Sequence, residues 1–158
     1  MSIEDFINRY QQTNTLTAAE AKEVCEEPLR QLLFDYFKTH KNRNFALALL
    51  NRLIELRKDP DNLVSGDDLM LACYILGQHK QVEDCLLIWK AKRTDFDSYC
   101  YIDGQLIAFM GAQPTIDFLK TVNSEEAADA LFYTTGCVES GDYDSLDEYY
   151  SRNSYYWL

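Results

Sequence analysis

Apolar residues recur along most of the chain at the spacing i, i+3, i+4, i+7, which places them on one face of an α-helix. Stretches of this kind begin at Ile3, Leu29, Ala46, Leu69 and Val82, and the alternation typical of a strand is nowhere sustained. The pattern therefore predicts an all-α fold.

Residues that favour helix ends agree with this prediction. The segments 17–20 (TAAE) and 123–126 (NSEE) have the pattern of capping boxes, and 65–68 (SGDD) places two acids in a first helical turn. Pro28 is expected at the first position of a helix, and Pro60 is expected just after the end of another.

A longer period separates the expected breaks between helices. Gly77 and Gly111 are 34 residues apart, Gly111 and Gly141 are 30 apart, and a step of 34 back from Gly77 reaches Arg43 in a turn-like segment. A repeat of about 34 residues made of a helix, a tight turn and a second helix has the tetratricopeptide period. We therefore expect these glycines to lie between the two helices of successive pairs.

The segment 71–79 (LACYILGQH), followed by Val82 and Cys85, resembles the middle of a tetratricopeptide repeat. The resemblance extends over about residues 29–150, although most of the family's signature tryptophan, alanine and proline positions are not matched. It implies antiparallel helix pairs stacked as a short right-handed α-solenoid. An irregular helical bundle is the alternative.

The length of the chain suits one domain with a substantial core. We therefore expect a single helical-repeat domain over residues 1–158. Its expected parts are N-terminal helices in 1–27, helix pairs in 28–150 and a C-terminal aromatic cap in 151–158.

Charge divides the chain into two unequal halves. Residues 94–158 contain 12 acidic residues against Lys120 and Arg152, and they carry −10 of the net charge of −11. A field of one sign attracts basic proteins and repels nucleic acid and anionic membranes. We therefore expect a basic protein partner, with no binding to nucleic acid or membrane.

Two stretches, 89–103 and 139–158, combine acids with aromatic residues. Tyrosine and tryptophan carry much of the binding energy at protein interfaces, and neighbouring acids steer a basic partner. The predicted partner-binding residues are Asp95, Phe96, Asp97, Tyr99, Asp103, Asp142, Tyr143, Asp144, Asp147, Glu148, Tyr149 and Tyr150.

Structural roles are the alternative for both stretches. Asp95 and Asp97 have the carboxylates that a divalent cation prefers, but Asp97 also suits the N-cap of a helix that starts near Ser98. The C-terminal segment could be a capping helix whose aromatic residues close the open end of the array.

The remaining chemistry is sparse. The five cysteines form no C-x-x-C motif, the two histidines lie at predicted helix ends, and no phosphate-binding loop or zinc motif is present. The acidic start of the chain lacks the basic flank of a signal peptide, and the longest apolar run, 69–76, is too short to span a membrane. We expect a cytoplasmic, non-enzymatic protein without metal or cofactor.

Two functional hypotheses follow. The first is an interaction module that binds a basic protein, most concretely an immunity protein that neutralises a bacterial nuclease-like toxin. The chain is similar to colicin-type immunity proteins in its small size, helical make-up and acidic charge, but not in any aligned motif. The second is a tetratricopeptide-like scaffold or adaptor that holds a peptide in its concave face. Both leave the oligomeric state open.

Overall fold

The computed structural model describes all residues, 1–158, as an all-helical protein without β-strands. Two short 3₁₀ helices, Val82–Asp84 and Gly104–Leu106, lie among the α-helices. The α-helices are α1 (Ile3–Thr13), α2 (Ala18–Glu23), α3 (Leu29–Thr39), α4 (Arg43–Lys58), α5 (Gly66–Gly77), α6 (Cys85–Lys92), α7 (Phe96–Tyr101), α8 (Ala112–Thr121), α9 (Glu125–Ser140) and α10 (Leu146–Tyr150). The prediction of an all-α fold is confirmed.

Several helices begin where the sequence predicts. Thr17 and Ser65 form capping boxes with the acids three residues later, and these boxes start α2 and α5. Ser124 starts α9 by accepting a hydrogen bond from the N–H of Ala127, without the reciprocal bond of a box. Pro28 lies one position before the expected one, as the N-cap residue of α3, and Pro60 follows the end of α4 as expected.

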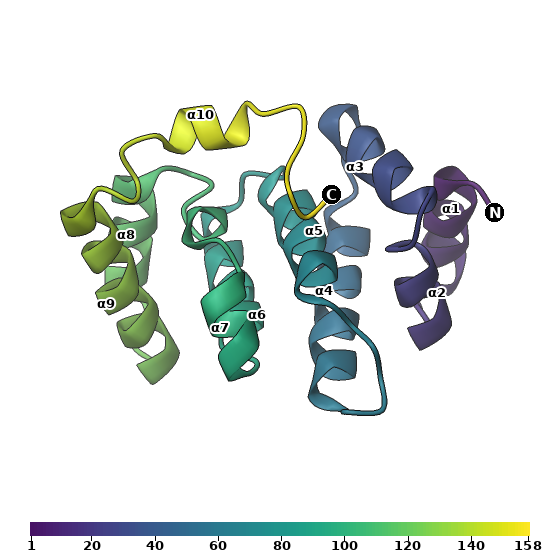
Figure 1. Cartoon of the computed structure of the whole chain (residues 1–158), viewed down its shortest axis with the longest axis horizontal. Coiled ribbons are helices and arrows are strands. Elements are labelled where there is room, and N and C mark those ends of the chain that lie inside the picture. Colours follow the sequence, from purple (N-terminus) through teal and green to yellow (C-terminus); the bar gives the residue numbers. More distant parts are fainter.

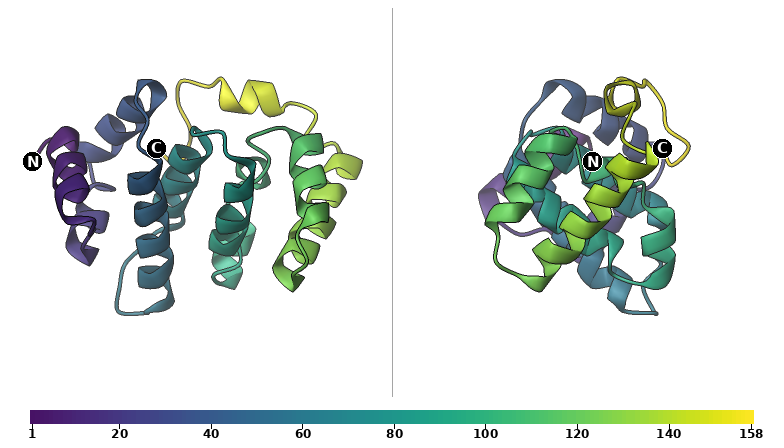
Figure 2. Two further views of the ribbon diagram at one scale, coloured as in Figure 1. Left: turned by 180° about the vertical axis from the view of Figure 1, so that it is seen from behind. Right: turned by 90° about the vertical axis from the view of Figure 1, so that its left-hand side faces the viewer.

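The helices from α4 to α9 stand side by side in two layers. Figures 1 and 2 show α4, α6 and α8 on one side of the molecule and α5, α7 and α9 on the other. Within this arrangement α4 packs most extensively on α5, and α8 packs most extensively on α9. Helices α1 and α2 lie at the opposite end of the row from α8 and α9 (Figure 1).

The three glycines lie at helix ends, as expected. Gly77 is the last residue of α5, whereas Gly111 and Gly141 flank α8 and α9 with φ values of 96° and 83°, which suit glycine. They do not join the two helices of the closest pairs, which are instead connected by residues 59–65 and 122–124. The expected pairing is therefore wrong. The glycine pattern pairs α5 with the helix that follows Gly77, but α5 packs most extensively on the preceding helix, α4.

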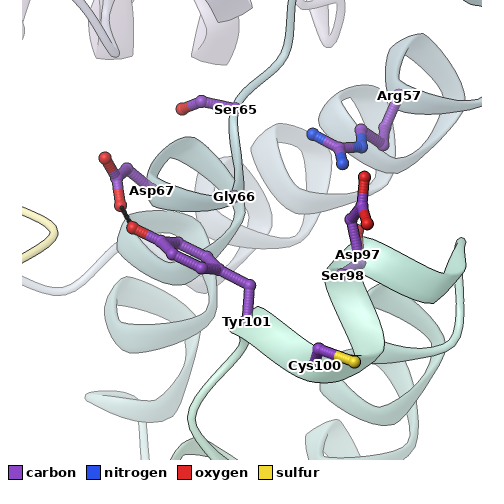
Figure 3. A pocket seen from close by; sticks show the side chains of 8 residues that line it. All are labelled: Arg57, Ser65, Gly66, Asp67, Asp97, Ser98, Cys100 and Tyr101. Atoms are coloured by element: carbon purple, nitrogen blue, oxygen red, sulfur yellow. Dashed lines mark hydrogen bonds between the residues drawn. The ribbon is translucent and has the colours of Figure 1, made fainter.

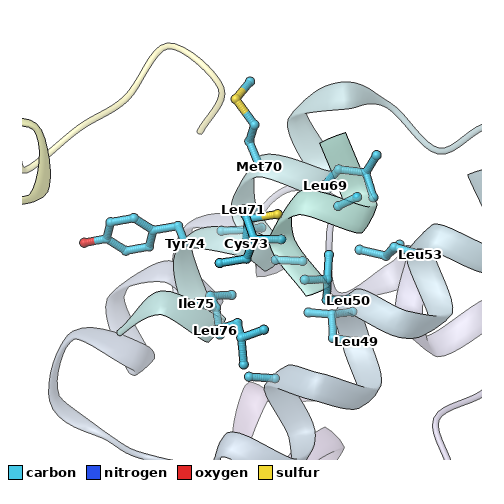
Figure 4. Close-up of a cluster of buried hydrophobic side chains, with 14 of the residues drawn as sticks. Leu49, Leu50, Leu53, Leu69, Met70, Leu71, Cys73, Tyr74, Ile75 and Leu76 are labelled. Atoms are coloured by element: carbon cyan, nitrogen blue, oxygen red, sulfur yellow. The ribbon is translucent and has the colours of Figure 1, made fainter. Parts of the chain in front are cut away.

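One hydrophobic core runs from α1 to the C-terminal residues. Helix α5 lies at its centre, and every residue from Leu69 to Gly77 is buried. Figure 4 shows side chains of this core from α5 together with Leu49, Leu50 and Leu53 of α4. A helix that is apolar all round needs neighbours on every side, and α4, α6 and the C-terminal residues provide them.

Residues 141–158, which we call the C-terminal strap, turn back from α9 across one end of the helices (Figure 1). Tyr155 and Trp157 pack on Phe34 of α3 and Tyr74 of α5. The Tyr155 and Trp157 rings stack with their centroids 4.6 Å apart, and the centroids of the other pairs among these four rings are 5.0 to 6.3 Å apart. The expectation that these aromatic residues close the open end of the array is therefore wrong. They cover α3 and α5 instead.

Arg30 explains where the strap ends. Its guanidinium donates to the carbonyls of Trp157, at 2.8 Å, and Cys25, at 2.7 Å, and forms an ion pair with Asp68. A buried guanidinium needs acceptors for its several N–H groups, and the strap provides one of them. Packed on Phe34, Tyr74 and Tyr155, Trp157 is 1% exposed.

None of the helices is at once long and apolar enough to pass through a membrane.

Candidate partner-binding surface

Asp95 has a structural role. Its carboxylate accepts a hydrogen bond from Arg57 Nε at 2.7 Å and another from the N–H of Ser98 at 2.7 Å, so that it caps α7. The Arg57 hydrogen bond lowers the pKa of Asp95 to about 2. The expectation that Asp97 caps this helix is therefore wrong, because α7 begins one residue after Asp95 and places Asp97 in the first turn.

Beside α7 lies a hollow of about 490 Å³, which Figure 3 shows with its lining side chains. Asp97 lies beside Arg57 in it, and the Tyr101 hydroxyl donates to Asp67 at 2.5 Å. Cys100 is its one nucleophilic thiol, and no histidine lines the hollow to act as its base. No group of three or more histidine, cysteine, aspartate or glutamate side chains in the molecule is placed to hold a metal ion.

Asp103 also serves the fold. Its two carboxylate oxygens accept hydrogen bonds from the hydroxyls of Tyr149, at 2.7 Å, and Tyr156, at 2.8 Å. Burial, reinforced by Asp103, raises the pKa of Tyr149. Asp103 therefore holds the strap and has no oxygen left without a partner.

The three predicted tyrosines of the strap are anchors as well. Besides the Tyr149 contact, Tyr143 donates to the carbonyl of Gly104 at 2.9 Å, and Tyr150 donates to that of Gln105 at 2.6 Å. Tyr143 and Tyr149 are buried and Tyr150 is half-buried. The tyrosine-rich composition of this segment thus reflects how it is fastened to residues 103–105.

The other predicted residues are exposed and lie in two places. Phe96, Asp97 and Tyr99 are on α7, and Phe96 is 79% exposed. Four acids lie in the strap, where they face solvent; they are Asp142, Asp144, Asp147 and Glu148. Of the two groups, only Tyr99 and Asp142 line a common hollow.

That hollow, which we call the aromatic groove, lies between α6, α7 and α9 and has a volume of about 370 Å³. The rings of Trp89, Tyr99 and Tyr133 contact one another in it, with centroids 5.2 to 6.4 Å apart. Arg93 lies over Trp89 and Tyr99, and the acids Asp129 and Asp142 are at the rim.

Lys92 fixes the position of α7 relative to α6 beneath this groove. Its buried ammonium group donates to the carbonyls of Tyr99 and Ile102 at 2.5 Å each, where α7 ends, and it lies about 5 Å from the rings of Tyr99 and Tyr133. Burial lowers the pKa of Lys92. A cation at the C-terminal end of a helix satisfies its last carbonyls and compensates the helix dipole.

Sequence reasoning missed the contribution of α9 to this surface. Phe132, a residue of the groove, is 85% exposed. A signal was present, because Leu131, Phe132 and Tyr133 are consecutive and cannot all face the same side of a helix.

Comparisons of the chain with protein-family models, with curated proteins and with solved structures found no match. Its function is therefore inferred from its own surface.

Proposed function

We propose that the protein is a non-enzymatic interaction module that binds a basic protein partner through the acidic surface of residues 94–158. The observation that carries this proposal is that these acids are not neutralised within the chain. Ten of the twelve are exposed, and Asp95 alone takes part in an ion pair.

Residues 1–93 differ in this respect. All the basic residues of the ion pairs belong to them, and six of their own acids are paired; those acids are Glu20, Asp35, Glu55, Asp68, Glu83 and Asp84. Unpaired charge of one sign raises the rate at which an oppositely charged partner associates and suppresses other partners.

For the arrangement of the helices we propose a short right-handed α-solenoid of the tetratricopeptide type. The two layers of Figures 1 and 2 support it, since successive helix pairs of a solenoid place alternate helices on opposite sides. Such an array presents extended surfaces made by several helices.

The most concrete version of this proposal is an immunity protein in the cytoplasm that covers the basic surface of a nuclease-like bacterial toxin. Its support is general: a strongly acidic, small, helical chain with aromatic residues on its acidic half. The alternative is a tetratricopeptide-like scaffold or adaptor that binds a peptide in its concave face. The aromatic groove favours it, since the groove lies between α6, α7 and α9 and is lined by the rings of Trp89, Tyr99 and Tyr133.

The test compares two variants with equal changes of net charge. The first reverses four exposed acids in the strap, namely Asp142→Lys, Asp144→Lys, Asp147→Lys and Glu148→Lys. The matched control reverses four exposed acids of the first half, namely Glu23→Lys, Glu26→Lys, Asp59→Lys and Asp61→Lys.

Each immobilised variant and the wild type are used to capture proteins from a lysate of the source organism at about 50 mM and about 300 mM salt. Attraction between exposed charges is weakly screened at the lower salt concentration and strongly screened at the higher one. We expect the wild type and the control variant to capture the same basic protein at low salt. The strap variant should capture little of it. Capture that is indifferent to salt, or that both variants lose equally, would contradict the proposal.

A further inference from the structure

Helix α9 ends the row of helices and is covered on one side only (Figures 1 and 2). Its buried residues form a single narrow stripe along its length, consisting of Ala127, Ala130, Thr134 and Cys137. The opposite side has no neighbour among the other helices.

This uncovered side, which we call the α9 outer face, is apolar and hollowed. It holds a shallow hollow of about 390 Å³, lined by Ala128, Leu131, Phe132, Thr135, Gly136 and Glu139. Phe132 and Gly136 also line the aromatic groove, so that Phe132 stands between two hollows with 85% of its surface exposed. A large exposed ring beside a hollow offers a partner apolar surface to bury, and aromatic residues carry much of the binding energy at protein interfaces.

Gly136 gives a second, independent indication. A Cβ atom at this position would meet nothing within 4 Å, so the fold itself does not require glycine there. Glycine inside a helix costs about 1 kcal/mol relative to alanine. Ala128 and Gly136 lie four residues before and after Phe132, so two small residues flank the ring along one row of the helix and leave room for a second helix to approach.

The chain's own aromatic tail does not cover this face. Tyr155 and Trp157 are committed to Phe34 and Tyr74, and Arg30 holds the last turn of the strap. The rest of the chain therefore leaves this face uncovered.

Charge identifies the kind of partner. Helix α9 carries four exposed acids and no lysine or arginine; the acids are Glu125, Glu126, Asp129 and Glu139. A second copy would bring the same four acids to the interface, and like charges at an interface are repelled. A basic helix instead pairs with them.

We infer that the α9 outer face binds an amphipathic helix of a basic partner. Phe132 inserts between apolar residues of that helix, Gly136 allows its backbone to come close, and Asp129 and Glu139 pair with its lysine or arginine residues. This inference rests on the proposed function and gives it a location and a partner class.

The experiment uses the full chain and a synthetic peptide of about 16 residues, the length of α9. Leucine occupies the i, i+3, i+4, i+7 positions of the peptide and lysine the others, so that it forms a basic amphipathic helix. A scrambled peptide of the same composition and a version with glutamate in place of lysine are the peptide controls. Binding is measured by fluorescence anisotropy, and backbone NMR shifts locate it.

Two protein variants change the α9 outer face in opposite ways. Phe132→Ser removes the exposed ring, whereas Gly136→Leu adds apolar surface but fills the space for the second helix. The matched control is Leu63→Ser, which removes a leucine that is 88% exposed in the connection between α4 and α5. Circular dichroism and thermal melting establish that all three remain folded.

We expect the lysine peptide to shift the resonances of residues 125–140 and to bind about tenfold or more weakly to Phe132→Ser and to Gly136→Leu, but unchanged to Leu63→Ser. If both variants bind it like the wild type, or if the wild type binds no helical peptide, the α9 site is wrong. The proposed function would still be tested separately, by the capture experiment with the two charge-reversal variants.

Two other results would overturn the partner class. Equal binding of the glutamate peptide means that the helix need not be basic. A dimer of the wild type that Phe132→Ser dissociates, seen by analytical ultracentrifugation, means that the occupant is a second copy.

Discussion

Helices α5 and α9 are both rich in apolar and small residues, yet their surroundings are opposite. In α5, Leu69 to Gly77 are all buried between α4, α6 and the C-terminal strap, whereas α9 buries four of its 16 residues. The position in the row decides this. A central helix needs apolar residues on every side, but a helix at the end needs one stripe. Phe132 lies outside that stripe, so packing within the chain does not account for it.

The same contrast holds for charge. The ion pairs join residues of the first half, with Arg57 to Asp95 reaching into the second. The acids of α9 have no such partners. The first half of the chain therefore has most of its ion pairs formed internally, whereas the α9 end of the molecule has both an uncovered apolar surface and acids without ion-pair partners.

The strongest test of this comparison truncates one large apolar side chain in each helix. Leu71→Ala in α5 should lower the free energy of unfolding by about 3 kcal/mol or more, because it leaves a cavity among buried side chains. Phe132→Ala in α9 should change it by less than about 0.5 kcal/mol. Urea denaturation followed by circular dichroism measures both. A large loss for Phe132→Ala would mean that the ring is covered in solution.

A smaller loss is expected at the strap. Trp157→Ala removes a fully buried side chain, but a terminal segment that loses its anchor can detach and be solvated. We therefore expect a loss of about 2 to 3 kcal/mol in the free energy of unfolding, at or below the usual range for a buried tryptophan. Asn153→Ala, at an exposed position of the same segment, is the control and should leave the urea midpoint unchanged. Equal, negligible losses would show that the strap is not docked on α3 and α5.

Local chemistry made the helix starts predictable. Thr17 and Ser65 satisfy backbone N–H groups within one turn, and no distant residue is needed to form these caps. At α7 the sequence offered two aspartates, and Arg57, 38 residues earlier in the chain, pairs with Asp95. The sequence does not reveal this long-range pair, and its local pattern favours Asp97 for the cap.

The destination of the strap was unpredictable for the same reason. Arg30 and Trp157 are 127 residues apart, and only the packing of α3 against α5 brings their partners together. The candidate site shows the same limit: the acids near 142–148 are exposed, but Asp103 and the strap tyrosines Tyr143, Tyr149 and Tyr150, which the sequence favours as binding residues, anchor the strap. Phe132 was missed because exposure depends on which neighbours a helix has.

The smallest expected effect concerns Asp95, the one ion-paired acid of the second half. Its pKa of about 2 in the folded protein lies below its ordinary value of 3.8, so folding favours the ionised form. This contribution to stability is complete above about pH 4 and is lost as the pH falls towards about 2. Since the side chain is 37% exposed, solvent screening limits the pair with Arg57 to about 0.5 to 1 kcal/mol.

Asp95→Asn keeps an acceptor for the cap of α7 but removes the charge, so it isolates the ion pair. We expect its urea midpoint to lie below that of the wild type at neutral pH, and we expect the two midpoints to converge between about pH 4 and about pH 2. Asp97 lies two residues after Asp95, in the first turn of α7, and forms no ion pair. The urea midpoint of Asp97→Asn should therefore not converge with that of the wild type over this pH range. A midpoint difference for Asp95→Asn that stays constant over this pH range would mean that the variant acts through the cap, and that the second half of the chain has no ion pair that contributes to stability.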